Sequence, residues 1–203
     1  MPAVLPWPDT PVARIEALAL VETLNADLLS HDSATLTLDR WCADHRLAEP
    51  AKVTAERVRG ADKPATAEIR AALHVDAATP VAYRSVRLRC GGHVLSEADN
   101  WYVPGRLAPA MNQALETSDI AFGRAVQALH FSRHTVSAQL LWSPLPAGWE
   151  MQGLPPAGSG ALAIPHHVLE HRAVLATPDG MPFSLVVEDY TEAVLAFPQP
   201  GGK

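Results

Sequence analysis

The spacing of apolar residues predicts helices in the first part of the chain. Apolar residues recur at helical spacing over 12–30, and Asp32 and Ser33 are capping residues before a second, short helix over about 34–45. A further helix is expected to begin at Ser118 or Asp119 and to run through about Leu129. The segment 62–75 is a short helix or loop, and 105–115 is a loop with a short helix.

Alternation of apolar and polar residues predicts strands in the rest of the chain. The sequence VAYRSVRLRC, followed by Gly-Gly and HVLSEADNWYVP, is typical of an antiparallel hairpin over 81–104. The turn TPDG joins the last two predicted strands, which gives a second antiparallel pair. Strands are therefore expected over 51–60, 81–90, 93–104, 132–142, 166–176 and from 181 onward.

The order of these elements indicates the fold class. Tight turns join the strands, and helices come first and in the middle instead of between each strand pair. We therefore expect an α+β fold with a single antiparallel β-sheet of about six strands and helices packed on one face. The 203 residues would form one domain. Within it, 1–11 is an extended arm, 143–165 is a loop or lid rich in proline and glycine, and 198–203 is a tail.

Composition limits the partners that the chain can have. The formal net charge is −6 and there is no basic block, so nucleic acid is not an expected partner. No stretch approaches the ~20 apolar residues of a membrane span, and the N-terminus lacks the pattern of a signal peptide. No sequence pattern pairs Cys42 with Cys90, which favours a reduced, cytoplasmic setting.

Arg84 is the first candidate for chemistry. It shares a strand face with Val86 and Leu88, while Arg87 lies on the other face. A buried guanidinium is costly unless it is paired and hydrogen-bonded. Arg84 is therefore either a structural ion pair (or an edge residue that reaches water) or an anchor for the carboxylate of a ligand.

Glu188 and the histidines give weaker signals. An acid after the apolar run of the last strand is usually exposed, which is the expectation for Glu188. His130 and His134 have helical spacing for zinc, but that stretch alternates like a strand, which separates their rings too far for one ion. We expect histidines on the surface or in loops, no metal site and no cofactor.

Four short elements, in order, are similar to those of bacterial chorismate lyases. LLSHDSATLTLDRW resembles an element near the start of that family's sequences, and VAYRSVRLRCGG with NWYVP resembles its arginine-bearing hairpin. IAFGRAV resembles a helix start with Gly-Arg, and GMPFSLVVEDY resembles the closing strand with its glutamate. The hairpin also resembles the UTRA domain, the ligand-binding domain of GntR-type transcription regulators. The resemblance implies an antiparallel sheet with a flap that closes over the ligand.

The resemblance also implies roles for single residues. Arg84, with Arg87 as the alternative, would bind the ring carboxylate of the substrate together with the backbone N–H of Phe122, which precedes Gly123 of the Gly-Arg pair. Glu188 would lie near the hydroxyl end of the product and act in catalysis with Arg84. Ala34 would stand at the flap position that covers the ring.

Two functions follow as expectations. The first is a cofactor-free lyase that eliminates pyruvate from chorismate, or a close relative, to give 4-hydroxybenzoate, as in ubiquinone biosynthesis. The alternative is a UTRA-like module that binds a small acid, or a family member without activity. Such modules usually follow a DNA-binding domain, whereas about 50 residues without a basic recognition helix precede the first strand. Either way the partner is a small aromatic or cyclohexadienyl carboxylate.

Overall fold

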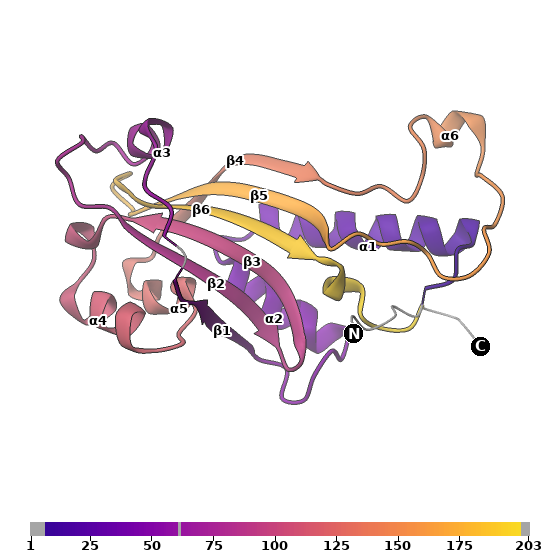
Figure 1. The fold of residues 1–203 in the computed structure, drawn as a ribbon, viewed down its shortest axis with the longest axis horizontal. Helices are drawn as coiled ribbons and strands as arrows, with labels where there is room; N and C mark the ends of the chain where they lie inside the picture. The colour runs from indigo at the N-terminus through magenta and orange to yellow at the C-terminus, as the bar shows by residue number, and fades with distance from the viewer. Residues whose placement is uncertain (1–6, 61, 200–203) are drawn as a thin grey trace.

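A single six-stranded antiparallel sheet forms the centre of the computed structural model, which describes residues 7–60 and 62–199 (Figure 1). The strand order is β1-β2-β3-β6-β5-β4, so the predicted hairpins β2–β3 and β5–β6 lie side by side in the middle. The α+β class and the six strands are confirmed. The strands are β1 (Val53–Val58), β2 (Ala82–Cys90), β3 (His93–Tyr102), β4 (Ser132–Leu140), β5 (His167–Ala176) and β6 (Pro182–Thr191).

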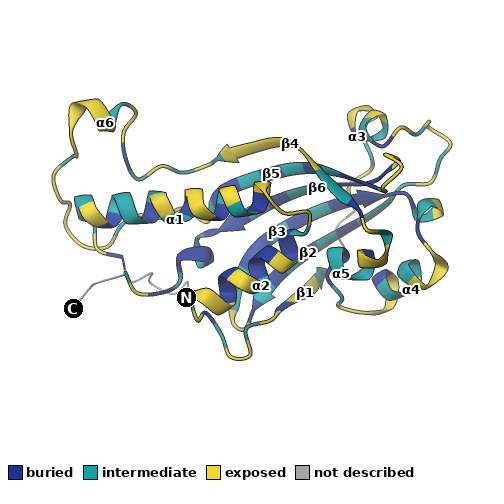
Figure 2. Ribbon diagram, turned by 180° about the vertical axis from the view of Figure 1, so that it is seen from behind, coloured by how far each residue is buried: buried dark blue, intermediate teal, exposed yellow. Residues whose placement is uncertain are grey.

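The long helices cover one face of this sheet (Figure 2). They bury an apolar stripe against it and leave the opposite stripe exposed, as amphipathic helices do. The short helix α3 instead packs on the other face, where Ile69 and Leu73 contact Trp101 and Leu185. The helices are α1 (Pro11–Leu29), α2 (Ala34–Asp44), α3 (Ala67–Ala72), α4 (Pro109–Thr117), α5 (Phe122–Ala125) and α6 (Trp149–Gln152), with 3₁₀ turns η1 (Pro104–Arg106), η2 (Gln127–Leu129) and η3 (Glu192–Leu195).

The helix predicted from Ser118 or Asp119 through Leu129 ends where expected, but its start is wrong and it is divided into two short elements. Ser118 ends α4 instead of capping a new helix, because its backbone N–H and its hydroxyl both bond to the carbonyl of Ala114. The helix α5 begins only at Phe122 and lasts four residues, and the 3₁₀ turn η2 follows it. The chain then leaves this region at His130, which has a left-handed backbone.

The cysteines are paired, which corrects the expectation that they are not. Cys42 of α2 and Cys90 of β2 form a disulfide with their Cα atoms 6.4 Å apart, and no free cysteine remains in the described residues. The two residues are 48 positions apart, so only the packing of α2 on the sheet brings them together. Disulfides persist mainly in oxidising compartments, so the argument for a reduced setting no longer has a basis.

The predicted arm, loop and tail are partly described. Residues 1–6 of the arm and 200–203 of the tail lie outside the described residues. Trp7 is buried, its indole Nε1 donating to the Leu195 carbonyl at 2.9 Å, and Thr10 caps α1, so this part of the arm is packed. The segment 143–165 contains α6 and is mostly exposed, and it extends beyond one end of the sheet (Figure 1).

Candidate functional site

A pocket lies between the sheet and the start of α2 and α5. Its floor comes from alternate residues of β2, β3 and β6, which point to the helix-covered face because successive side chains of a strand point to opposite faces. The strands contribute four polar or charged residues to the lining, Arg84, Asn100, Arg133 and Glu188, and the start of α2 adds Asp32, Ser33 and Thr35. Most of the wall is apolar, with Val86, Leu88, Ala98, Phe122, Phe131 and Val186.

Arg84 is buried at one end of this pocket, and few hydrogen bonds compensate the burial of its charge. Its residue is 3% exposed, and its only hydrogen bond in the described structure runs from Nη2 to the Ile120 carbonyl at 2.8 Å. Nε and Nη1 are buried and have no partner among the described residues. Burial lowers the pKa of Arg84, and the neighbouring guanidinium of Arg57 lowers it further. Tyr102 and Asp119 oppose this effect, but Arg84 forms no ion pair with a carboxylate in the described structure, and two of its nitrogens stay unpartnered.

Asn100 lies directly beside Arg84 on the neighbouring strand. The two residues are paired in the β2–β3 register. The Asn100 Oδ1 atom accepts a hydrogen bond from the Ser184 hydroxyl at 2.8 Å, which leaves the amide Nδ2 as a donor on the same face. The floor near Arg84 therefore presents donors and suits an acceptor-rich group.

Glu188 is buried at the other end, which corrects the expectation of an exposed strand end. Its Oε2 atom lies 2.6 Å from Nη2 of Arg133 and accepts a hydrogen bond from Tyr190 at 3.2 Å. The side chains of Arg133 and Glu188 are 4% and 7% exposed. Although burial alone would lower it, the Glu188 carboxylate raises the pKa of Arg133. Glu188 is therefore held by a cation inside the pocket.

His171 lies behind this ion pair and is fully buried, so the expectation of surface or loop histidines is wrong for it. It is the register partner of Glu188 on β5, and its Nε2 atom lies 2.8 Å from Oδ1 of Asn25. An amide oxygen only accepts, so Nε2 carries the hydrogen. Burial and the nearby charge of Arg133 lower the pKa of His171 to about 4, against the opposing effect of Glu188. The ring is therefore neutral at pH 7.

The cover of the pocket comes from two close-packed segments. Ser33 caps α2, and the first turn of α5 contributes Phe122 and Gly123. Gly123 permits the close approach, because a Cβ there would lie 3.0 Å from Oγ of Ser33 and 3.6 Å from Oγ1 of Thr35. The free space beneath this cover is about 40 Å³, enough for a few water molecules.

The residues that the resemblance singled out lie mostly together. Ala34, Arg84, Phe122, Gly123 and Glu188 all line this one pocket. No residue of 143–165 lines it, so that segment does not cover it.

The other arginine of the hairpin lies elsewhere. Arg87 is on the opposite face of β2, where it pairs with Glu97 at 3.1 Å and Glu56 at 3.5 Å.

Sequence reasoning missed Arg133, Asn100 and His171. Arg133 is the second residue of β4, a strand whose other residues are largely exposed, so the pattern gives it no core signal. Asn100 could not be matched to Arg84 from the sequence, because a two-residue Gly-Gly turn puts Asp99 opposite Arg84. Only the irregularity at Leu88/Arg89 shifts the register to Asn100.

A relative with high sequence identity places the chain in a family. The chain is 59% identical over 196 residues to the uncharacterized protein y4mC of Sinorhizobium fredii, a match that covers 96% of this chain and 83% of that protein. The chain belongs to the y4mC family. No family model matches the sequence.

Solved structures show the fold that the y4mC family member adopts. PhnF of Mycobacterium smegmatis superposes with a TM-score of 0.51 and 14% identity, covering 83% of this chain and 68% of PhnF. The effector domain of PhnF alone gives a TM-score of 0.50 and 13% identity, covering 79% of this chain and 89% of that domain. The fold is thus that of the UTRA-like effector domains.

A third match involves a longer protein. The possible transcriptional regulator YydK of Bacillus subtilis matches with a TM-score of 0.43 and 16% identity, over 74% of this chain and 62% of YydK. In the described part of the y4mC family member, no helix is long and apolar enough to cross a membrane.

Proposed function

We propose that this protein is a binding module for a small cyclic carboxylate, which lies between the sheet and the start of α2 and α5. The observation that carries the proposal is the guanidinium of Arg84, which is buried in a largely apolar pocket and has two nitrogens without a partner in the described structure. A buried charge is costly to leave uncompensated, and a carboxylate compensates it with charge-assisted hydrogen bonds.

The second end of the pocket favours a ligand with a polar group opposite its carboxylate. Arg84 and Glu188 are two strands apart on the sheet and two residues out of register. A strand spacing of ~4.8 Å and a rise of ~3.4 Å per residue put their Cα atoms about 12 Å apart, so the two side chains can bracket a single six-membered ring. Glu188 accepts hydrogen bonds and Arg133 donates them, which suits a ring hydroxyl.

Entry of such a ring requires movement of the cover. The free space of about 40 Å³ is far below that of a six-membered ring with substituents. The cover consists of short segments around Ser33 and Phe122, and Arg84 itself bonds to one of them through the Ile120 carbonyl. A carboxylate that binds Arg84 therefore acts directly beside the segment that has to move.

The experiment is calorimetric titration of the purified chain with matched ligands. We expect 4-hydroxybenzoate to bind, benzoate to bind more weakly, and the neutral 4-hydroxybenzamide not to bind. Arg84→Met should weaken the binding of 4-hydroxybenzoate about 10- to 150-fold, the scale of a lost hydrogen bond between charged groups. Arg87→Met, on the opposite face of the same strand, is the control and should leave the affinity unchanged.

The amide and the control variant decide the outcome. Equal binding of the carboxylate and the amide would refute the role of Arg84 as an anion site. Equal loss of binding in Arg84→Met and Arg87→Met would show that the effect comes from the strand and not from the pocket.

A second candidate function is the cofactor-free lyase. It is favoured by the meeting of Ala34, Arg84, Phe122, Gly123 and Glu188 in one pocket, because these positions come from the resemblance to chorismate lyase. The reaction would eliminate the enolpyruvyl group of chorismate as pyruvate, with loss of a ring proton, and leave 4-hydroxybenzoate. The residues would hold the dianion in a reactive pose and stabilise charge on the departing group.

A coupled assay separates the two candidates. Release of pyruvate from chorismate, abolished in Arg84→Met and strongly reduced in Glu188→Gln, would establish the lyase. Binding of 4-hydroxybenzoate without release of pyruvate would establish the binding module. The ion pair with Arg133 leaves Glu188 engaged before any ligand arrives, which favours the second outcome.

A further inference from the structure

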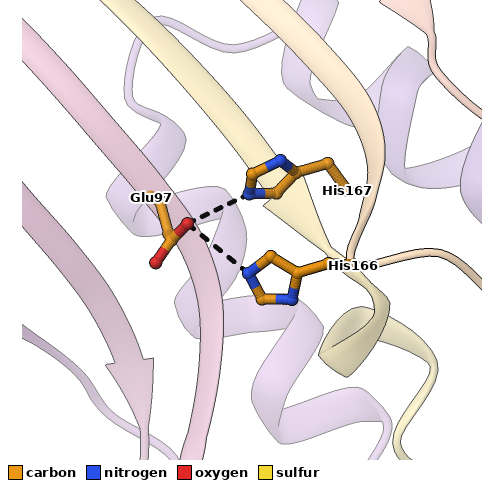
Figure 3. Close-up of side chains that lie close together, drawn as sticks. All are labelled: Glu97, His166 and His167. Carbon is orange, nitrogen blue, oxygen red and sulfur yellow. Dashed lines mark hydrogen bonds and ion pairs between the residues drawn. The ribbon is translucent and has the colours of Figure 1, made fainter.

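A cluster of two histidines and a glutamate lies where β5 begins (Figure 3). Glu97 comes from β3, His167 is the first residue of β5, and His166 directly precedes it. Glu97 is on the sheet face opposite to Ala98 and Asn100, which line the pocket. The cluster is therefore separated from the carboxylate pocket by the sheet.

The three side chains present their ligand atoms at the spacing of a metal centre. Oε2 of Glu97 lies 3.0 Å from Nε2 of His167 and 3.5 Å from Nε2 of His166, and all three ligand atoms lie within 4.8 Å of one another. A tetrahedral ion with bonds of ~2.0–2.1 Å holds neighbouring ligand atoms about 3.3 Å apart. The observed distances lie on either side of that value.

The contact between His166 and Glu192 fixes which nitrogen of the His166 ring carries the hydrogen. Nδ1 of His166 lies 2.8 Å from Oε2 of Glu192, so Nδ1 carries a hydrogen and donates it. In a neutral ring Nε2 then has only a lone pair, and that lone pair faces the carboxylate of Glu97. A cation between Nε2 and the carboxylate resolves the repulsion, and a carboxylate behind the distal nitrogen is the usual outer contact of a metal-binding histidine.

The other contacts hold the cluster in place. Nε of Arg87 lies 3.1 Å from Oε1 of Glu97, which leaves Oε2 as the atom directed at both rings. The backbone N–H of Glu192 donates to the His166 carbonyl at 2.9 Å, which fixes the residue that supplies the outer carboxylate.

We propose that Glu97, His166 and His167 bind one zinc ion, with Glu192 as the residue that orients His166. Two imidazoles and a carboxylate match the ligands that zinc accepts, and three protein ligands leave a fourth position for water. The side chain of His166 is 58% exposed, so the ion enters from solvent. The bound ion ties β3 to the end of the long segment that joins β4 to β5.

The test is equilibrium dialysis of the chain, free of any histidine tag and stripped with chelator, against zinc. We expect one ion per chain. His166→Ala with His167→Ala should abolish this binding, and Glu192→Gln should weaken it about 10- to 100-fold, the usual effect of an outer contact. His134→Ala, on the exposed strand β4, is the matched control and should bind zinc as the unchanged chain does.

Two results would overturn the site. One is the absence of stoichiometric binding at zinc concentrations of about 100 µM, well above the affinities of protein zinc sites. The other is one ion per chain that the double variant still binds. Circular dichroism of each variant shows whether it is folded, and the visible spectrum of a cobalt-loaded chain reports the geometry independently. The carboxylate titrations address the opposite face, so either proposal can fail while the other stands.

Discussion

Replacing Arg84 by methionine should stabilise the ligand-free protein. The guanidinium is 3% exposed, it makes one hydrogen bond, and its Nε and Nη1 atoms have no partner in the described structure. Methionine has a similar length and no polar hydrogen, so it can fill the same space among Val86 and Leu88 without stranding a donor. The variant therefore removes the cost of burying these unpartnered donors.

The size of the effect follows from the donors involved. Two buried unpaired donors cost ~1–3 kcal/mol each, and the variant is relieved of this cost. Loss of the hydrogen bond to the Ile120 carbonyl lowers the free energy of unfolding by ~1.5–3 kcal/mol. The midpoints of these ranges, about 4 and about 2 kcal/mol, leave a central expectation of a gain of about 1–2 kcal/mol in the free energy of unfolding. For a chain of this length that raises Tm by about 2–8 °C.

Urea unfolding followed by tryptophan fluorescence measures this free energy in the absence of ligand. Arg87→Met is the control and should lose at most ~1 kcal/mol, because its ion pairs with Glu97 and Glu56 are partly exposed. A ligand-free Arg84→Met protein that is less stable than the unchanged chain by 1 kcal/mol or more would refute the reasoning. It would mean that the guanidinium holds the fold together and does not await an anion.

Two further predictions concern stability. The pKa of His171 falls from its ordinary 6.5 to about 4 on folding, because the folded protein disfavours the charged ring. The contribution of this residue to the free energy of unfolding is therefore fully present above pH 6.5 and is lost as the pH falls toward 4, by about 3 kcal/mol. Urea curves between pH 8 and 4 should show this loss for the unchanged chain and a smaller loss for His171→Gln; identical pH profiles would contradict it. The disulfide closes a separation of 48 residues, so reduction, or replacement of Cys42 and Cys90 by alanine, should lower the free energy of unfolding by ~2–4 kcal/mol. Dithiothreitol should then have no effect on the double variant, and two reactive thiols in the unfolded, unreduced chain would disprove the pairing.

Much of the fold could be predicted because the helices and strands follow from the local spacing of apolar residues. The alternation in both hairpins and the helical spacing in α1 reflect which face each element buries, and the structure has these elements close to the expected bounds. The failure at Ser118 has a local cause of another kind. A serine can cap the start of a helix or close the end of one, and only the packing of α4 decides between them.

The site was predictable only in part. The parity of β2 separates Arg84 from Arg87, and the burial of alternate residues agrees with that parity. The partner of Glu188 was not predictable, because Arg133 is 55 residues away on a strand that only β5 joins to the sheet. The same holds for Cys42 with Cys90 and for Glu97 with the two histidines.

The amino-acid sequence by itself determined the strands, the long helices and the face of the sheet on which Arg84 lies, since each depends on neighbours a few positions away. Only the tertiary structure decided what that guanidinium meets, which acid is neutralised, which cysteines join and where imidazoles gather around a carboxylate. These outcomes depend on the strand order β1-β2-β3-β6-β5-β4, which brings distant segments within a few ångströms. Electrostatic and covalent pairing acts over such short distances, so it follows from the arrangement of the strands and not from their individual patterns.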